Sequence, residues 1–536
     1  MSAELHDRYR EHGWWRDETF LDDLRRFASE TPDRPVLMSH RAGEDVVISY
    51  AELAGLTETC AARLAALGVG SGDVVAVQLP NWWELLPLGL ACARVGAIFC
   101  PMTIIYRKRE LEFVLRLTEA KVVVTMAEWA GLELGQIVGD LAAALPDPPR
   151  VLVAGGPGPA GSLSFEEYFF GPPRPEDEPP PAGAELGPDD PFLMLFTSGT
   201  TGESKGVLHS QNTLFASASA YADVLSQDAS SVAFISHVAT HYSGFVTGML
   251  TSLLRGGSTL LLDVWDAAAF VRIAPRYRVT MFYGAPNFLM DLLAAQQANP
   301  GDLSSLRYVI SGSAPIPPLV LERIRAAFDV SVVALWGMSE NGATTITRPA
   351  DPPDWAEHSD GSPLGGMEIR IDTSVVPGSE DGSGLFLVRG PSQCLGYFKR
   401  EELYAACLDA DGWFDTGDLA RPDGRGGIRI TGRIKDIVVS GSSNVPVAEV
   451  ESALLRHRQV GEAAVIGVPT EFDELVCAVV VPNGEPPSLE SLRDHLAGEG
   501  FSEKYLPVRL ELAGELPRTI TGKVRKVELR AQYAGT

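Results

Sequence analysis

Hydrophobic and polar positions in the first part of the chain predict helices that alternate with strands. Helical spacing covers residues 22–28, 50–67 and about 82–95, and apolar runs predict strands at 46–49 and 73–79. Strands that alternate with helices favour a largely parallel sheet with helices packed on its faces. This part of the chain is therefore predicted to be α/β.

Later stretches first continue this pattern and then change it. Apolar runs at 259–263, 281–283, 308–311 and 331–335 extend the α/β arrangement. The strands at 385–389 and 427–430 are short and separated by Gly/Asp turns, which favours a small antiparallel, barrel-like unit. Residues 155–190 are rich in Pro, Gly and acidic residues, which predicts a surface connection rather than core.

The last stretch, from about residue 436, has strand and helix signals of its own. Strands are predicted at 437–439, 463–468 and 475–481, and helices at 447–457 and 489–496. This stretch is long enough to fold as a separate small α+β domain.

Composition excludes several classes of protein. The chain has 536 residues and a formal net charge of −26, so an anionic nucleic acid is a poor partner. Its six cysteines form no CxxC pair, which favours inert thiols in a reducing compartment. The apolar stretch 85–105 is interrupted by Pro87, Arg94, Gly96 and Pro101, so we expect a buried helix and strand rather than a membrane span, and a cytoplasmic protein.

A candidate phosphate-binding loop follows the apolar run 192–196. The run ends in a segment of Gly, Ser and Thr that closes on one lysine: Thr197, Ser198, Gly199, Thr200, Thr201, Gly202 and Lys205. Backbone N–H groups and hydroxyls in such a loop can surround phosphate oxygens, and a lysine adds charge. Ser204 rather than Gly precedes Lys205, so the loop is not a Walker A loop. The alternative is a Gly/Ser-rich surface turn.

This loop resembles the signature loop of the adenylate-forming superfamily. That superfamily includes acyl-CoA synthetases, luciferases and the adenylation domains of peptide synthetases. The resemblance implies that the loop binds the phosphates of ATP and that Thr201 is also a magnesium ligand. Ser204 stands where the family usually has proline.

Two further segments carry the resemblance. Trp336 and Gly337 precede Met338, Ser339 and Glu340, and an aromatic ring before a Gly turn can stack on a purine while a carboxylate holds Mg²⁺. By itself this could be an ordinary strand-to-loop turn. The resemblance implies that Ser339 lies at the α-phosphate and that Glu340 binds the metal. It also implies that an upstream segment lines the adenine and the acyl pocket: Gly312, Ser313 and Ala314.

Asp418 follows a tight Asp-Thr-Gly turn, and one carboxylate suits two ribose hydroxyls. The alternative for Asp418 is an ordinary solvated turn. The alternative for the segment 432–436 is a solvated charged linker. The family resemblance implies that Arg433 lies near the ribose and that Lys435 is the hinge.

Lys523 lies in a segment that resembles the family's Pro-x-Thr-x-x-Gly-Lys motif. A lysine held by a Gly turn can stabilise the charge that builds up when a carboxylate attacks the α-phosphate. The resemblance makes Lys523 the candidate adenylation lysine. His241 resembles the family's residue beside the acyl site, with a core histidine as an equal alternative.

The resemblance implies a large N-terminal domain (1–434) of stacked α/β subdomains plus the antiparallel unit, hinged at Lys435 to a small mobile domain (435–536). It also implies two half-reactions, adenylation and then transfer to coenzyme A, with a second face around Gly441 serving the transfer. Ser440 and Ser442 replace the usual basic residue and Gly of that face. The two steps are therefore expected to differ in efficiency, or the acyl acceptor to differ.

The segments 13–19 and 336–342 resemble the branch that contains cyclohexanecarboxylate-CoA ligases and medium-chain acyl-CoA synthetases. That branch implies ATP, Mg²⁺ and coenzyme A as cofactors and a medium-sized apolar acid as substrate, whether alicyclic, aryl or aliphatic. Two rivals stay open: an enzyme that loads a separate carrier protein, and a non-catalytic acyl-nucleotide binding protein. A homodimer and a downstream carrier or acyltransferase also stay open as partners.

Overall fold

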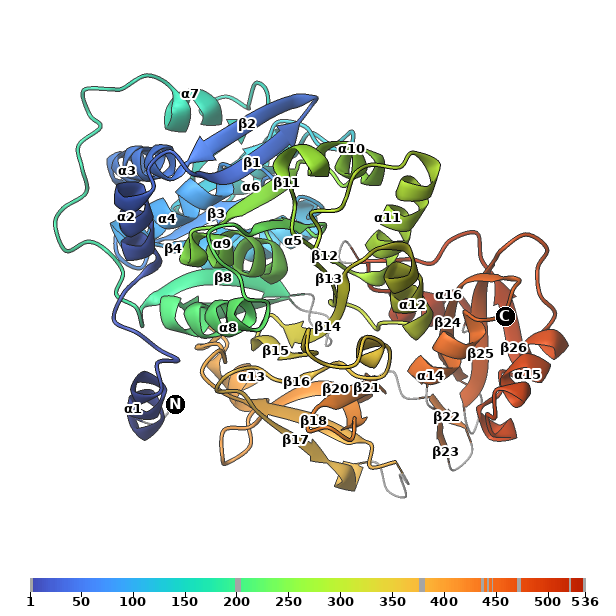
Figure 1. The fold of residues 1–536 in the computed structure, drawn as a ribbon. Coiled ribbons are helices and arrows are strands. Elements are labelled where there is room, and N and C mark those ends of the chain that lie inside the picture. Colours follow the sequence, from blue (N-terminus) through green and yellow to red (C-terminus); the bar gives the residue numbers. More distant parts are fainter. Residues whose placement is uncertain are drawn as a thin grey trace.

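The structure is a computed structural model. It describes residues 3–197, 204–375, 381–434, 438–440, 443–445, 447–469, 474–519 and 522–533. Figure 1 shows a large body that contains the N-terminal residues, with a smaller unit of C-terminal residues beside it.

Two large sheets form the body, and both are mostly parallel. The nine-stranded sheet has the order β16-β15-β14-β13-β12-β10-β11-β1-β2, with antiparallel pairs only at its two ends. Its strands are β1 (Pro35–Arg41), β2 (Glu44–Ser49), β10 (Val232–Ile235), β11 (Ser258–Leu262), β12 (Met281–Gly284), β13 (Tyr308–Ser311), β14 (Ser331–Met338), β15 (Gly342–Ile346) and β16 (Ser362–Pro363).

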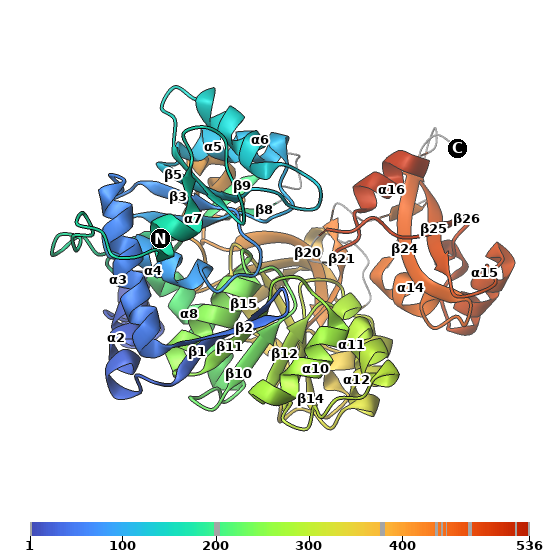
Figure 2. The same ribbon diagram turned by 90° about the horizontal axis from the view of Figure 1, so that it is seen from above.

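The eight-stranded sheet has the order β19-β9-β8-β4-β3-β5-β6-β7 and is antiparallel only at β19-β9-β8. Its strands are β3 (Val74–Val77), β4 (Ile98–Pro101), β5 (Val122–Met126), β6 (Arg150–Ala154), β7 (Leu163–Ser164), β8 (Pro191–Thr197), β9 (Lys205–Ser210) and β19 (Gly396–Tyr397). Figure 2 shows the two sheets as separate layers.

Helices cover both faces of both sheets. The largest core cluster lies between the sheets and includes residues of α2 (Phe20–Glu30), α3 (Tyr50–Ala66), α4 (Leu85–Val95), α8 (Gln211–Val224) and α9 (Thr251–Arg255). The far face of the nine-stranded sheet packs against α10 (Ala267–Tyr277), α11 (Pro286–Ala298) and α12 (Pro318–Ala327). The far face of the eight-stranded sheet packs against α5 (Lys108–Thr118) and α6 (Leu134–Ala143).

The sequence explains where α3 and α4 begin and end. The Ser49 hydroxyl accepts from the Glu52 N–H at 3.2 Å and the Glu52 carboxylate accepts from the Ser49 N–H at 2.8 Å, a capping box that satisfies two N–H groups at the start of α3. Gly96 ends α4 with φ 81°, a conformation that glycine adopts without a Cβ clash. The following strand β4 is fully buried, so the expected buried helix and strand within 85–105 are confirmed.

The predicted antiparallel unit is a four-stranded sheet of order β17-β18-β20-β21. Its strands are β17 (Glu368–Asp372), β18 (Gly384–Arg389), β20 (Phe414–Pro422) and β21 (Ile428–Arg433), with the short helix α13 (Glu401–Ala405) beside it. The helix α1 (Ala3–Glu11) and the 3-10 turns at Trp355–Glu357 and Thr373–Val375 complete the body.

The C-terminal residues fold around two small apolar clusters of their own. They form β22 (Val438–Ser440), β23 (Ser443–Val445), α14 (Val447–Leu454), β24 (Val460–Pro469), β25 (Glu474–Pro482), α15 (Leu489–Gly498), a 3-10 turn at Glu503–Tyr505, β26 (Arg509–Leu512) and α16 (Lys526–Tyr533). The predicted hinge residue Lys435 lies outside the described residues, so the boundary there stays a prediction.

One expectation was wrong. The segment 155–190 is not only a surface connection, because it contains β7 and the helix α7 (Phe165–Phe170), whose Phe165 and Phe169 are buried in the largest core. The segment is also fixed by the buried Arg63, whose guanidinium lies 2.8 Å from the Asp177 carboxylate. The Pro- and Gly-rich composition hid the few aromatic side chains that anchor the segment.

No helix in the described part of the chain is both long and apolar enough to cross a membrane. All six cysteines are free thiols, and only Cys407 is partly exposed.

Candidate active site

The predicted site residues gather where strands of the nine-stranded sheet end. β12 and β13 run parallel, with Gly284 opposite Ser311, and β14 runs beside them with Ala334 opposite Ser311. The segments that follow these strands therefore leave the sheet at the same edge. Ligands of open parallel sheets bind at this carboxyl edge.

The candidate phosphate loop joins two antiparallel strands, β8 and β9, with Thr197 opposite Lys205. The loop residues Ser198, Gly199, Thr200, Thr201 and Gly202 lie outside the described residues, so their roles stay predictions. The Lys205 ammonium lies 4.7 Å from the centre of the Tyr397 ring, a cation–π contact that directs it toward Glu340.

Glu340 is a buried carboxylate surrounded by donors and cations. It is 7% exposed, and its Oε1 accepts a hydrogen bond from the Tyr397 hydroxyl at 3.0 Å. Burial raises the pKa of Glu340, while the hydrogen bond and the ammonium groups of Lys205 and Lys523 act to lower that pKa. The two lysines are far apart in the sequence, yet both act on the pKa of one carboxylate.

His209 holds the segment that precedes Glu340. Its Nε2 lies 2.7 Å from the Ser339 carbonyl oxygen and its Nδ1 lies 2.9 Å from the Thr213 hydroxyl. Since a carbonyl oxygen only accepts, Nε2 carries the proton. Complete burial lowers the pKa of His209 to about 4, so the ring is neutral near pH 7.

Asp418 is held by two donors from different elements. The Trp336 indole Nε1 donates to its Oδ2 at 2.9 Å and the Arg433 Nε donates to its Oδ1 at 2.8 Å. Each carboxylate oxygen retains a further lone pair for a ribose hydroxyl. Trp336 is 9% exposed and its ring packs edge-on against Phe386, with centroids 4.7 Å apart. Stacking of Trp336 on a purine therefore stays a prediction.

The segment of Gly312, Ser313 and Ala314 follows β13. A side chain at Gly312 would meet the Leu335 carbonyl oxygen at 2.7 Å and the Tyr283 hydroxyl at 2.8 Å, so only glycine fits there. The Tyr283 hydroxyl lies 3.1 Å from the Ser313 hydroxyl. These contacts fix the backbone that is expected to face adenine. The Gly337 and Met338 backbones pair with Ala343 and Gly342 across β14 and β15.

His241 lies directly before a π-helix, η1 (Ser243–Leu250). Such helices are rare and occur frequently at functional sites. Gly244 packs so closely on the segment 238–239 that a side chain there would overlap the Val238 carbonyl oxygen. Burial and the nearby Lys523 lower the pKa of His241 to about 4. The residue as a whole is partly exposed, and its role beside the acyl site stays a prediction.

Lys523 belongs to a tight turn of the C-terminal residues. The Thr519 N–H donates to the Lys523 carbonyl oxygen at 2.7 Å, and the Lys523 N–H donates to the Thr519 hydroxyl at 3.1 Å. The neighbouring Gly522 lies against Asn287 in the first turn of α11, where a side chain would overlap the amide oxygen. Lys523 also influences the pKa values of His237, His241 and Glu340. The turn of Lys523 therefore packs against the start of α11, and the role of Lys523 in adenylation stays a prediction.

Among the described residues, no cluster of three or more His, Cys, Asp or Glu side chains could hold a metal by itself. Mg²⁺ is commonly bound by one or two carboxylates together with substrate phosphates and waters. A single buried carboxylate, Glu340, beside the candidate phosphate loop fits that mode. Thr201, the other predicted metal ligand, lies outside the described residues.

Among the residues predicted from the sequence, Lys205 lies on the Tyr397 ring that bonds Glu340, and Arg433 bonds Asp418. Their roles stay predictions. Sequence reasoning missed Tyr397 and His209, which hold Glu340 and Ser339. These partners lie 57 and 130 residues away along the chain, and neither belongs to a predicted motif. Gly441, like Lys435, lies outside the described residues, so its role stays a prediction.

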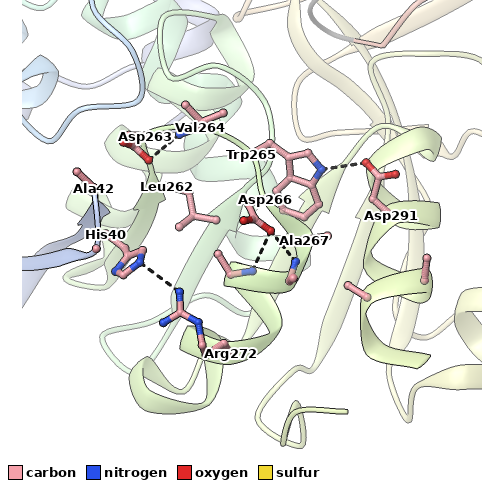
Figure 3. Close-up of a pocket in the computed structure, with 15 residues that line it drawn as sticks. His40, Ala42, Leu262, Asp263, Val264, Trp265, Asp266, Ala267, Arg272 and Asp291 are labelled. Carbon is pink, nitrogen blue, oxygen red and sulfur yellow. Dashed lines mark hydrogen bonds between the residues drawn. The ribbon is translucent and has the colours of Figure 1, made fainter. Parts of the chain in front are cut away.

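A groove of about 900 Å³ lies elsewhere, between the β1–β2 turn and the helices α10 and α11. Figure 3 shows that its polar side chains bond to one another or to the backbone: Trp265 donates to Asp291 at 3.0 Å, and Asp266 caps α10. None of the predicted site residues lines this groove, and no buried polar atom among its lining residues lacks a partner. It is therefore not the candidate active site.

Two family models match the chain. The model described as AMP-binding enzyme matches residues 24–398, and the model described as AMP-binding enzyme C-terminal domain matches residues 449–523. The second match includes Lys523, and the first includes the candidate phosphate loop and Glu340.

Individual proteins are similar over nearly the whole chain. A medium-chain fatty-acid–CoA ligase of Escherichia coli (strain K12) is 32% identical, with 97% of this chain and 92% of the relative covered. The 3-[(3aS,4S,7aS)-7a-methyl-1,5-dioxo-octahydro-1H-inden-4-yl]propanoyl:CoA ligase of Mycobacterium tuberculosis is 34% identical, with 95% and 97% covered. The crystal structure of ATP-bound MatB from Rhodopseudomonas palustris has a TM-score of 0.83 at 28% identity, with 96% and 99% covered.

Proposed function

The chain belongs to the AMP-binding enzyme family, and we propose that it is an AMP-forming ligase that activates a carboxylic acid with ATP and transfers the acyl group to coenzyme A. The observation that carries this proposal is the arrangement at Glu340: its carboxylate accepts from the Tyr397 hydroxyl, the Lys205 ammonium lies on the Tyr397 ring, and the turn of Lys523 packs against the start of α11. Two ammonium groups at one edge suit a triphosphate and a carboxylate better than they suit an uncharged ligand.

In the first half-reaction, a carboxylate oxygen of the acid attacks the α-phosphorus of ATP. A new P–O bond forms, the bond to the β-phosphate bridge breaks, and pyrophosphate leaves. Lys523 neutralises the negative charge shared by the carboxylate and the α-phosphate, whereas Lys205 binds the phosphates that leave. Bound magnesium, held by Glu340 and the phosphates, would supply further charge neutralisation.

Asp418 and Arg433 position the ribose in this proposal. The Asp418 carboxylate is already oriented by Trp336 and Arg433, so it requires little rearrangement to accept two ribose hydroxyls. His209 and Tyr397 act as positioning residues, because they hold Ser339 and Glu340 and touch no nucleotide in this scheme.

In the second half-reaction, the thiol of coenzyme A attacks the acyl carbonyl carbon of the acyl-adenylate. The C–S bond forms, the C–O bond to AMP breaks, and the thiol proton is released. We propose that the C-terminal residues 435–536 turn about Lys435, withdraw Lys523 and present the face around Gly441. One cleft can serve both half-reactions in this way.

We propose a medium-sized, mainly apolar acid as substrate. The residues expected around its acyl group include Tyr283 and the segment of His241, which are flanked by aromatic and aliphatic side chains. The relatives are named for a medium-chain fatty acid and for a propanoic acid that carries a fused-ring dione. Both acids have an extended apolar skeleton.

The sequence around Gly441 supports a second candidate function. Ser440 and Ser442 replace residues that the family normally has there, so adenylation and transfer are expected to differ in efficiency, or a separate carrier protein to replace coenzyme A. The alternatives share the first half-reaction and differ only in the acceptor.

Pyrophosphate release tests the proposal. The purified chain is supplied with ATP, magnesium and a panel of alicyclic, aryl and medium-chain acids, with and without coenzyme A. We expect release with some acids, and thioester when coenzyme A is present. Release without thioester would favour the carrier-loading alternative. Binding of ATP and acid with no release from any acid in the panel would contradict the ligase and support a binding protein.

A further inference from the structure

The residue that follows β10 and Ser236 is a buried histidine whose polar atoms have no bonding partner. His237 is 1% exposed, and neither of its ring nitrogens has a hydrogen-bond partner among the described residues. Leaving a buried polar group unpaired costs free energy, so native structures rarely retain such a group without a reason.

Of the two buried histidines in the described part of the chain, only His237 has a ring without hydrogen-bond partners. Both histidines are buried and lie near the same site, yet His209 bonds through both nitrogens, to Ser339 and Thr213. Burial does not by itself leave a histidine without partners here. The surroundings of His237 therefore supply no hydrogen-bond partner for its ring, although the ring could bind one.

The backbone of His237 is fixed firmly. The Asn81 Nδ2 donates to the His237 carbonyl oxygen at 3.1 Å, and the Asn81 Oδ1 accepts from the Ala239 N–H at 2.6 Å. The amide of Asn81 thus bridges the residues on both sides of Val238. A residue whose backbone is held in this way loses little further conformational entropy when its side chain binds a ligand.

Aromatic rings hold the imidazole from two sides. The ring centroid of His237 lies 5.2 Å from that of Tyr283 and 5.5 Å from that of Phe288, both at edge-on angles. Neither neighbour bonds to a ring nitrogen, because the Tyr283 hydroxyl is paired with Ser313. The walls around His237 are therefore apolar, while the ring itself is polar.

His237 also lies at the acyl side of the proposed site. Tyr283 belongs to β12, next to the segment of Gly312, and Phe288 follows Asn287, which contacts Gly522 beside Lys523. Burial and the nearby His241 and Lys523 lower the pKa of His237 to about 3, so the ring is neutral near pH 7. A neutral imidazole offers one N–H donor and one acceptor nitrogen.

We propose that His237 is a specificity-determining residue that hydrogen-bonds a keto or hydroxyl oxygen on the acyl part of the substrate. The preferred acids then have a mainly apolar skeleton with a second, uncharged polar group besides the carboxylate. This inference rests on the proposed ligase function and narrows its substrate class.

The imidazole and its aromatic neighbours favour a keto or hydroxyl group over a second carboxylate or a fully apolar acyl chain. A keto oxygen accepts from the imidazole N–H, and a hydroxyl can either accept from that N–H or donate to the other nitrogen. A second carboxylate would need a cation of its own here, because the nearby Lys523 is assigned to the reacting carboxylate in the proposed function. A fully apolar acyl group would leave both nitrogens unpaired in the complex as well as in the free protein.

Matched pairs of acids test this inference. Cyclohexanecarboxylate is compared with 4-oxo- and 4-hydroxycyclohexanecarboxylate, and octanoate with 7-oxo- and 7-hydroxyoctanoate. The readout is kcat/KM for pyrophosphate release by the full chain. We expect the wild type to prefer at least one oxo or hydroxy acid over its plain partner by roughly 10- to 100-fold, the range of a hydrogen bond that a site is built to make.

Substitution at His237 separates specificity from general damage. His237→Leu is expected to remove the preference by lowering kcat/KM for the oxo or hydroxy acid at least about tenfold more than kcat/KM for the plain acid. His237→Gln retains a donor and an acceptor and should restore part of the preference. His209→Leu is the matched control, because it removes a paired buried histidine and should depress the plain acid and its polar partner alike.

The outcomes distinguish this inference from the proposed function. Release with plain acids at least as fast as with every oxo and hydroxy partner would overturn the inference and leave the ligase function intact. Equal loss for both members of a pair in His237→Leu would also overturn it, since the residue would then act on the reaction or on folding. No release with any acid would overturn the ligase function and, with it, this inference.

Discussion

The polar residues of the site owe their behaviour to their partners more than to their type. Glu340 and Asp418 are equally buried carboxylates, at 7% exposed each, yet they have different neighbours. Glu340 is bonded by the Tyr397 hydroxyl and lies near two ammonium groups, whereas Asp418 is bonded by an indole and a guanidinium. The first arrangement suits phosphates and a metal, and the second orients a carboxylate for hydroxyl groups.

The Asp418 interaction can be tested by removing its carboxylate. Asp418→Ala leaves the Trp336 Nε1 and the Arg433 guanidinium without their acceptor and removes the predicted ribose partner. We expect the KM for ATP in pyrophosphate release to rise by roughly 10- to 100-fold, and stability to fall by about 1–3 kcal/mol. Asp372→Ala, on the exposed edge of the same sheet, is the control and should leave the KM unchanged. An unchanged KM in Asp418→Ala would exclude Asp418 from nucleotide binding.

The buried histidines predict how stability depends on pH. His237 and His209 have folded-state pKa values of about 3 and about 4, below the ordinary value of 6.5. As pH falls below 6.5 the unfolded chain binds these protons first, so this contribution is complete above 6.5 and is lost as pH falls toward 4. Each histidine contributes a slope of at most about 1.4 kcal/mol per pH unit in this window.

Denaturant unfolding between pH 7.5 and 5 measures that slope. His237→Leu removes one of the histidines whose pKa is lowered, a set that also includes His209 and His241. Its unfolding free energy should therefore decrease with falling pH less steeply than that of the wild type, by up to about 1.4 kcal/mol per pH unit. The same variant should be no less stable than the wild type by more than about 1 kcal/mol at pH 7, since an unpaired buried polar ring is removed. Parallel pH profiles for the two proteins would contradict a neutral, buried His237.

The sequence predicted the residues of the site that belong to motifs and missed those that act through distant contacts. Lys205 begins β9, Glu340 follows β14 and Asp418 lies within β20. Each carries chemistry that its neighbours in the sequence make recognisable. The pairing of Glu340 with Tyr397 depends on how β19 joins the edge of the eight-stranded sheet, which no local pattern encodes. The orphan state of His237 is likewise a property of the packed interior.

At the scale of elements, the connections between strands and helices place the chemistry. The segment between β10 and the π-helix η1 carries both His237 and His241. Asn81, from the connection after β3, clamps this segment at Val238. The π-helix begins where Gly244 packs on the same residues. Backbone packing of this segment therefore sets the positions of two site histidines.

Gly244→Ala tests this packing. Its methyl group would overlap the Val238 carbonyl oxygen, so the segment of His237 and His241 must shift. Since misplacement by about 1 Å can cost 10²-fold in rate, we expect pyrophosphate release to fall by at least about tenfold. The control is Gly55→Ala in α3, where the space is open and the added methyl should stabilise the helix by about 0.5–1 kcal/mol without loss of activity. Full activity in Gly244→Ala would mean that the segment tolerates displacement.

Elements with strong periodicity were predicted well, and elements with mixed composition were not. The strand at 308–311 coincides with β13, and the helix at 50–67 ends one residue before the prediction, as α3. In contrast, 155–190 contains α7, because two buried phenylalanines decide its structure despite the surrounding Pro and Gly. A short segment anchored by a few tertiary contacts has too little periodicity to be identified.

At the scale of the whole molecule, the C-terminal residues pack against the body at the start of α11. Figure 1 shows their unit beside the end of the nine-stranded sheet where α12 lies, and Gly522 contacts Asn287 at the start of α11. The turn of Lys523 thus lies at a junction between the body and the smaller unit. In the proposed scheme, adenylation requires this junction, whereas thioester formation requires that it opens.

Gly522→Ala tests the junction. Gly522 and Gly500 both have positive φ values, 82° and 90°, so alanine is strained at either position by about 1–2 kcal/mol. Only at Gly522 would the methyl group also overlap Asn287. We expect Gly522→Ala to slow pyrophosphate release by about tenfold, with thiolysis of a supplied acyl-adenylate nearly unchanged, and Gly500→Ala to affect stability alone. Equal rates of release in the two variants would show that the contact does not matter for adenylation.

The most direct test of the central claim measures both half-reactions in single turnovers of Lys523→Ala. The control is Lys526→Ala, which removes an ammonium 2.7 Å from Glu451 in the same unit. We expect pyrophosphate release to fall by several orders of magnitude only in Lys523→Ala. Both variants should convert a supplied acyl-adenylate and coenzyme A to thioester at rates near that of the wild type. Pyrophosphate release by Lys523→Ala at the rate of the Lys526→Ala control would show that Lys523 is not the adenylation lysine.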